Sequence, residues 1–142
     1  MDAPGPAIGQ PLDDLDHALI AAALAAMRQH YRPFWHTVAA ALRGRDGRVW
    51  TGIHLGATVG RLSICAEAVA LGRAILEGSG DVVSAVAVRH PKEEELDQEI
   101  AVVPPCGACR EMLLDHAPEA WVILPGGIKR TVRELLPQPY RR

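Results

Sequence analysis

Two cysteine motifs that lie far apart in the sequence constrain this chain more than any other feature. The first is Cys65-Ala66-Glu67 and the second is Pro105-Cys106-Gly107-Ala108-Cys109-Arg110. Apolar residues follow each motif at helical spacing, so each motif places thiols at a helix start, where the positive end of the helix dipole favours thiolate. A fold that uses both motifs together must bring two helix starts to one place.

Cys65, Cys106 and Cys109 are the three cysteines of the chain. An odd number of cysteines without a secretory signal fits thiolate ligands better than a disulfide framework. Three thiolates that converge from two helix starts suit tetrahedral zinc, and they leave the fourth position for water, as in catalytic sites. We therefore expect one zinc ion per chain, with Glu67 beside the bound water as a proton shuttle.

Other interpretations of these residues stay open. A Cys-x-x-Cys pair alone is also a redox motif, although that motif normally follows the first strand of a different fold. A closed structural zinc site would take His54, His90 or His116 as its fourth ligand. An inactive zinc-binding protein is a further alternative, but such a protein would not need Glu67. Arg110 is either a surface residue or a cation that offsets the surplus negative charge of three thiolates.

The rest of the sequence predicts one α/β domain. Residues 1–13 are rich in Pro and Gly and indicate a flexible lead-in, and residues 14–142 have the length of a single domain. Helices are expected over residues 14–31 and 65–78 and after residue 105, and strands on both sides of Asp46-Gly47, over 82–88 and over 120–124. This order describes helices packed on one mixed sheet. The acidic stretch over residues 92–99 is expected to be a solvated loop.

The first predicted helix should bury one apolar face, made of Leu15, Leu19, Ala22, Ala23 and Met27.

Charge and hydropathy exclude two classes of partner. The formal net charge is -2, so no sequence-wide positive charge is available to hold a phosphate backbone, and nucleic acid is not an expected partner. No apolar stretch reaches the roughly 20 residues that cross a bilayer, and no secretory signal stands near Met1. We therefore expect no membrane partner and a cytoplasmic location.

Taken together, the motifs resemble those of the cytidine deaminase superfamily, specifically its small homotetrameric branch, which includes blasticidin S deaminases. The resemblance runs from about Asp14 to Tyr140. It includes VAAALRGRDGRVWTG, similar to the family's first hairpin, and TVRELLP, similar to its carboxy-terminal signature. The resemblance implies a three-layer α/β sandwich, with a mixed five-stranded sheet flanked by helices, and a homotetramer with shared active sites.

For the chemistry, the resemblance implies zinc-dependent hydrolytic deamination of a cytosine nucleoside or a related aminopyrimidine. By matching position, Cys65, Cys106 and Cys109 hold the zinc and Glu67 is the general acid/base. Glu67 would protonate the ring nitrogen, zinc-bound hydroxide would attack the amino-bearing carbon, and ammonia would leave. The backbone around Ala66 would help to hold the pyrimidine ring.

The sequence departs from cytidine deaminases where they hold the sugar. Their Asn-x-Glu at the end of the second strand corresponds here to His54, Leu55 and Gly56, and losing a buried polar contact costs discrimination on the order of several kcal/mol. His54 either contacts the substrate or has a structural role at the end of the hairpin. The alternative substrates are therefore an antibiotic of the blasticidin S type or another amino-substituted heterocycle.

Two more positions bear on the substrate. His36 stands where cytidine deaminases tend to place a phenylalanine against the substrate, and Tyr140 matches an aromatic residue that often closes the site. The candidate substrate contacts are therefore His36, His54, Gly56, Ala66 and Tyr140.

Overall fold

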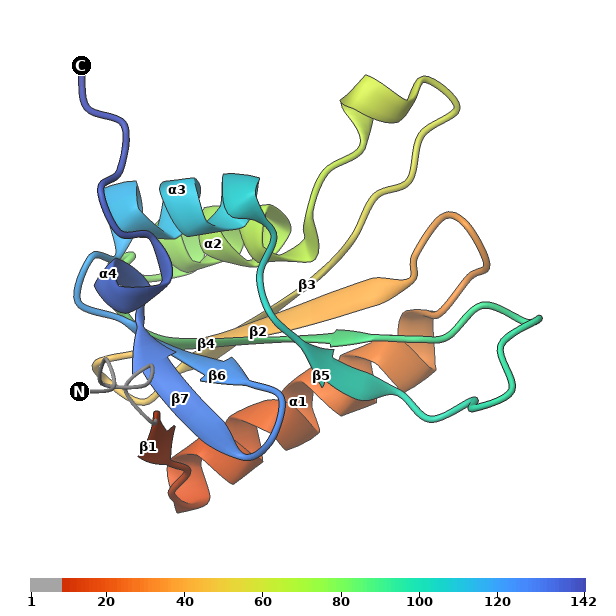
Figure 1. The fold of residues 1–142 in the computed structure, drawn as a ribbon, viewed down its shortest axis with the longest axis horizontal. Coiled ribbons are helices and arrows are strands. Elements are labelled where there is room, and N and C mark those ends of the chain that lie inside the picture. The colour runs from red at the N-terminus through yellow and green to blue at the C-terminus, as the bar shows by residue number, and fades with distance from the viewer. Residues whose placement is uncertain (1–8) are drawn as a thin grey trace, which may run out of the picture.

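The computed structural model describes residues 9–142 as a mixed sheet with helices on both faces (Figure 1). Helix α1 (Asp14–His30) covers one face, and helices α2 (Ala66–Glu77) and α3 (Gly107–His116) cover the other. The predicted three-layer α/β sandwich is thus confirmed. Within the described part of the chain, no helix is both long and apolar enough to cross a lipid bilayer.

The sheet has the strand order β1-β7-β6-β4-β2-β3, and β5 pairs with β4. Its five longer strands are β2 (Val38–Gly44), β3 (Val49–Ile53), β4 (Val82–Arg89), β6 (Trp121–Leu124) and β7 (Ile128–Thr131). Strands β4 and β6 are parallel, and the other pairs are antiparallel. The implied mixed sheet is present, and the short strands β1 (Gln10–Pro11) and β5 (Ala101–Val103) extend it from five strands to seven.

The end of the lead-in differs from its expected form. Residues 1–8 lie outside the described residues, but Gln10 and Pro11 pair with β7 as strand β1. The side chain of Asp13 accepts a hydrogen bond from the N–H of Asp16, and the side chain of Asp16 accepts one from the N–H of Asp13. This reciprocal capping box fixes the first turn of α1 and ties the preceding residues to the domain.

The apolar face of α1 is rotated from its predicted position. Leu19, Ala23 and Met27 are buried, but Leu15 is 59% exposed. Asp16 is instead fully buried, and its Oδ2 lies 2.7 Å from Nζ of Lys129 on β7. A charged residue takes the inward position because a partner from another element neutralises it.

Small residues bring α2 close to the sheet. Ala66, Ala70 and Ala74 of this helix are fully buried. Opposite them on β3 stands Gly52, where a Cβ would collide with the backbone of Ala66 and Ala70. Glycine at this position therefore sets the distance between β3 and the start of α2, where Cys65 and Glu67 lie.

Two short helices complete the described structure. The 3-10 helix η1 (Gly60–Leu62) lies in the long loop between β3 and α2, and α4 (Val132–Leu135) follows β7. Figure 1 shows the loop with η1 projecting beyond the edge of the sheet.

Candidate active site

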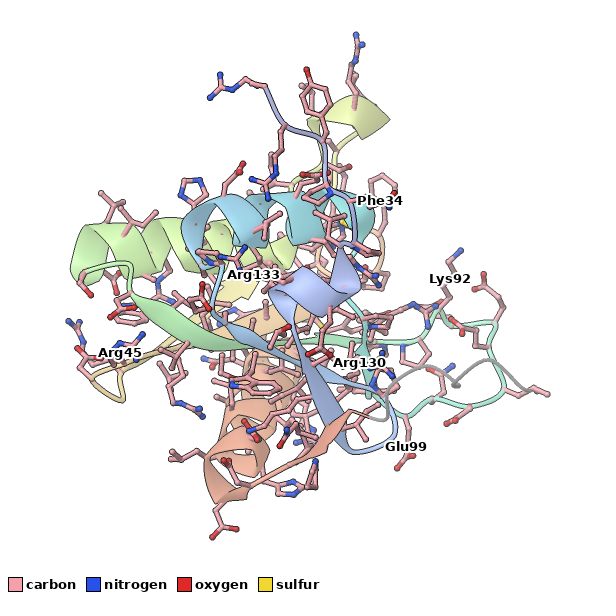
Figure 2. The ribbon with its side chains drawn as sticks, turned by 60° about the vertical axis from the view of Figure 1, so that its left-hand side comes forward. Phe34, Arg45, Lys92, Glu99, Arg130 and Arg133 are labelled. Atoms are coloured by element: carbon pink, nitrogen blue, oxygen red, sulfur yellow. The ribbon has the colours of Figure 1, made fainter. Side chains whose placement is uncertain are left out.

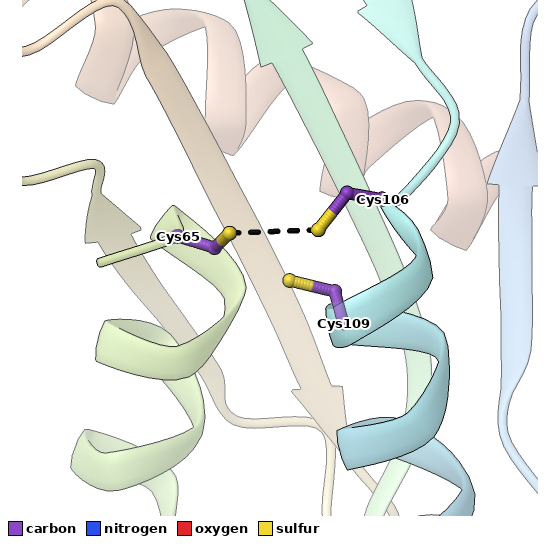
Figure 3. Close-up of side chains that lie close together, drawn as sticks. All are labelled: Cys65, Cys106 and Cys109. Atoms are coloured by element: carbon purple, nitrogen blue, oxygen red, sulfur yellow. Dashed lines mark hydrogen bonds between the residues drawn. The ribbon is translucent and has the colours of Figure 1, made fainter. Parts of the chain in front are cut away.

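The three cysteine side chains meet between the N-termini of α2 and α3 (Figure 3). Cys65 is the N-cap of α2, Cys106 is the N-cap of α3, and Cys109 lies in the first turn of α3. The sulfur atoms all lie within 4.8 Å of one another, and those of Cys65 and Cys106 are 3.5 Å apart. Tetrahedral Zn–S bonds of about 2.3 Å put sulfurs about 3.8 Å apart, so the cluster fits one zinc ion per chain.

The cluster contains a third sulfur, that of Cys65, which a Cys-x-x-Cys redox pair does not need. All three cysteines are free, so no disulfide joins Cys106 to Cys109. Among the residues that the structure describes, no histidine belongs to the cluster. Three protein ligands leave one coordination position for water or substrate, as in catalytic zinc sites.

The surroundings of the sulfurs keep two of the three protonated without a metal. Burial, followed by the hydrogen bond and charge of Glu67, raises the pKa of Cys109, and burial also raises the pKa of Cys65. Burial acts to raise the pKa of Cys106 as well, but hydrogen bonds from the N–H of Cys109 and from Cys65 lower it overall. A dipositive ion is therefore needed to hold three thiolates together.

We expect the metal-free protein to bind one zinc ion per chain and to release between about two and three protons at pH 7, because Cys65 and Cys109 are thiols before binding. Calorimetry in buffers of different ionisation enthalpy measures the proton count. X-ray absorption should show three sulfurs and one light atom around the zinc. A fourth protein ligand in the resting protein would contradict this arrangement.

Glu67 lies beside the cysteines in the first turn of α2. It is 5% exposed, and together with Cys65, Ala66 and Cys106 it lines a cavity of about 190 Å³. Its carboxylate is close enough to the thiol of Cys109 to contribute to the raised pKa of that thiol. A carboxylate that adjoins both the metal position and a cavity can accept a proton and return it there.

A larger cavity of about 480 Å³ adjoins the first, and Thr37 and His54 line both. We call the two spaces the inner cavity, next to the cysteines, and the outer cavity. The outer cavity is lined by the rings of Tyr31, Phe34 and His90 and by the charged residues Arg89, Lys92, Glu93 and Glu94. Figure 2 shows Lys92 on the outlying loop between β4 and β5, which contains the acidic stretch.

His54 is held in place at the boundary of the two cavities. The N–H of Thr37 donates to Nδ1 of His54 at 3.0 Å, and Nδ1 of His36 donates to the carbonyl of His54 at 2.8 Å. Burial, followed by the charge of His36, lowers the pKa of His54. His36 itself is not among the residues that line either cavity. Thr37 could not be identified from the sequence, because no motif marks it.

Gly56 packs against the backbone of Phe34 and Trp35, which leaves no room for a side chain at this position. Its N–H donates to the carbonyl of Trp35 at 2.8 Å, and a Cβ on Gly56 would collide with the carbonyl oxygen of Phe34. It is not among the residues that line the inner or the outer cavity. A glutamate at this position would therefore displace the segment around Phe34 rather than reach a substrate.

The last two predicted residues lie away from the inner cavity. Arg110 donates to the carbonyls of Pro105 and Leu135, so its guanidinium fastens the turn before Cys106 to α4. Tyr140 is 82% exposed and lines a separate hollow near the end of α3.

The sequence is similar to those of known proteins. The family model described as cytidine and deoxycytidylate deaminase zinc-binding region matches residues 13–124. The chain is 39% identical over 130 residues to blasticidin-S deaminase from Bacillus cereus, covering 89% of this chain and 93% of that protein. It is 35% identical over 125 residues to cytidine deaminase from Halalkalibacterium halodurans, covering 84% and 89% respectively.

Solved structures of cytidine deaminases have a similar fold. Cytidine deaminase from Mycobacterium leprae matches with a TM-score of 0.71 at 30% identity, covering 86% of this chain and 97% of that chain. Cytidine deaminase from Mycobacterium tuberculosis gives a TM-score of 0.73 at 29% identity, covering 89% and 97%. The family model spans most of the chain, and the cysteines that carry the zinc motifs form one cluster. The chain therefore belongs to the cytidine and deoxycytidylate deaminase family and is a zinc hydrolase of that family.

Proposed function

We propose that this protein releases ammonia from a cytosine nucleoside or a related aminopyrimidine, whose ring enters the inner cavity. The observation that carries the proposal is that Glu67 lines the same cavity as Cys65 and Cys106. Zinc, when bound by the three cysteines, supplies a Lewis acid that lowers the pKa of a coordinated water towards about 7. The formal net charge of -2 supports a small-molecule substrate rather than nucleic acid.

Glu67 moves the protons of this reaction. It accepts one proton from the attacking water and passes it to the ring nitrogen. It then takes the second proton of that water from the hydroxyl now attached to the ring carbon and delivers it to the amino group, which leaves as ammonia. Ala66 is the first residue of α2, so its N–H has no partner within the helix and is available to an oxygen of the pyrimidine ring. The burial of both residues keeps bulk water away from the transferred proton.

A second candidate substrate is an antibiotic of the blasticidin S type or another amino-substituted heterocycle. The observation that favours it is the contact between Gly56 and Phe34, which leaves no room for the carboxylate that cytidine deaminases are expected to place there. The relative from Bacillus cereus is named a blasticidin-S deaminase. The chemistry at the cysteines is the same for both candidates, and they differ in what fills the outer cavity.

We also propose a homotetramer in which subunits complete one another's sites. Large apolar side chains that are each more than 40% exposed gather on the loop with η1 and on the neighbouring turn: Phe34, Leu55, Val59, Leu62 and Ile64. Burying such residues against another subunit would remove apolar surface from water. Tyr140, exposed and remote from its own inner cavity, would then close a site of another subunit.

Ammonia release by the zinc-loaded protein tests the reaction. The panel is cytidine, 2′-deoxycytidine, blasticidin S and, as a purine control, adenosine. At least one cytosine compound should be turned over with kcat/KM of about 10⁴ M⁻¹s⁻¹ or more, and adenosine should not be. Removing the zinc with a chelator should abolish the activity, and adding zinc back should restore it. Zinc-loaded, folded protein that releases ammonia from no cytosine compound would contradict the proposal.

A further inference from the structure

We propose that His54 selects the substrate by donating its Nε2–H to a hydrogen-bond acceptor on the substituent that the pyrimidine carries. The inference rests on the proposed function, and it concerns which partner donates the hydrogen bond between His54 and the substrate. His54 lines both the inner and the outer cavity, so a substrate whose ring lies beside Glu67 must pass its substituent by this side chain.

The hydrogen bonds of His54 determine which ring nitrogen carries the proton. Nδ1 accepts from the N–H of Thr37 at 3.0 Å, and the hydroxyl of Thr37 lies 3.3 Å from the same atom. A backbone N–H is always a donor, so Nδ1 carries no hydrogen and the proton of the neutral ring lies on Nε2. Burial, followed by the charge of His36, lowers the pKa of His54 and so favours this neutral ring.

The surroundings also prevent the ring from exchanging its two nitrogens. A flip would turn Nδ1 away from the N–H of Thr37, which would lose its partner. The bond from His36 to the carbonyl of His54 holds the backbone at this point. Over residues 9–142, no group forms a hydrogen bond with Nε2 of His54. One hydrogen, and no lone pair, is therefore left for a ligand.

This polarity differs from that of an Asn-x-Glu grip. An asparagine offers both a donor and an acceptor, and a glutamate accepts from sugar hydroxyls. Here the carboxylate is excluded at Gly56 by the carbonyl of Phe34, and His54 can only donate. The favoured substrates are therefore those whose substituent presents an ether, carbonyl or carboxylate oxygen to His54, whether or not that oxygen also carries a hydrogen.

A set of three substrates at each sugar position tests this polarity. At the sugar position under test, cytidine has a hydroxyl, which both donates and accepts a hydrogen bond. The O-methyl ether at that position can only accept, and the deoxy analogue can do neither. The comparison is made separately at the 2′, 3′ and 5′ positions. At one position, the ether should keep kcat/KM within about threefold of cytidine, and the deoxy compound should lose about fivefold to tenfold. In His54→Phe, which keeps a ring but has no N–H, that deoxy penalty should disappear.

Two further variants separate recognition from folding. His54→Gln supplies an amide donor of similar reach and should retain part of the deoxy penalty. His30→Phe makes the same replacement as His54→Phe at an exposed position at the end of α1, and it should leave the substrate pattern unchanged. Zinc content and thermal melting are measured for each variant. ¹⁵N NMR of the natural protein identifies the protonated nitrogen of His54 directly, without any substitution.

The outcomes distinguish this inference from the proposed function. A protein that deaminates no cytosine compound contradicts the function. Turnover with a deoxy penalty that is equal in the natural protein and in His54→Phe overturns the inference, as does an ether that loses as much as the deoxy compound at every position. A proton found on Nδ1 of His54 also overturns it, including when His54→Phe fails to fold.

Discussion

Replacing Glu67 by glutamine is expected to lower kcat by about 100-fold to 10,000-fold, while zinc content and melting temperature stay close to those of the natural protein. The carboxamide has the shape of the carboxylate but cannot accept a proton and return it. Because Glu67 is 5% exposed, solvent has little access to replace it in proton transfer. The measurement is kcat at saturating concentration of the best substrate on the panel.

A matched control for Glu67→Gln lies on the same helix. Glu77 ends α2, and its exposed carboxylate pairs with Arg73, so Glu77→Gln should leave kcat unchanged. Equal zinc content in both variants shows that any difference in turnover arises from chemistry rather than from metal loss. If Glu67→Gln retains turnover within a few-fold of the natural protein, Glu67 does not carry the proton.

Replacing Lys129 by methionine is expected to lower the free energy of unfolding by about 3 to 5 kcal/mol. Nζ of Lys129 lies 2.7 Å from Oδ2 of Asp16, and the side chains are 13% and 0% exposed. Without the ammonium group, the buried carboxylate keeps only the N–H of Asp13 as a hydrogen-bond donor. Its Oδ1 already has no partner among the described residues. Denaturant-induced unfolding, followed by circular dichroism, measures the loss.

A second substitution shows whether the uncompensated charge causes that loss. Asp16→Asn keeps an oxygen that accepts from the N–H of Asp13 but carries no charge, so the double variant should be more stable than Lys129→Met alone. Arg133→Met is the comparison on the surface, because its pair with Glu119 is 53% and 76% exposed, and it should cost no more than about 1 kcal/mol. If Lys129→Met and Arg133→Met lower the free energy of unfolding equally, burial does not make the pair of Lys129 and Asp16 more stabilising than an exposed pair.

The metal site could be predicted from the sequence because its parts are local. Each cysteine motif opens a helix, and the helix start positions the sulfur. The expected preference for thiolate at these helix starts is outweighed at Cys65 and Cys109, where burial raises the pKa. The hairpin around Asp46-Gly47 and the buried strand β4 likewise follow from short patterns. Strands β1 and β5 and helix α4 contain two to four residues each, so they carry too little pattern to be identified.

Other features depend on partners that are remote in the sequence. The helical pattern placed Leu15 inward, but α1 buries Asp16 instead because Lys129 neutralises it from β7. The proton on Nε2 of His54 follows from the N–H of Thr37, which is a backbone group that every residue except proline supplies. Residue types alone therefore could not decide between a structural and a substrate-contacting His54.

The contact between Gly56 and the turn at Phe34 affects how this protein can change its specificity over evolutionary time. The turn is closed by a backbone bridge between Arg32 and His36, and Phe34 within it has a φ of 70°, a left-handed conformation that few side chains favour. A single codon change to glutamate at position 56 would meet the carbonyl of Phe34 before it could contact any sugar. A lineage that acquires a carboxylate here must first shorten or reshape the turn. A substitution at position 56 alone therefore cannot convert one substrate grip into the other, because the turn at Phe34 has to change with it.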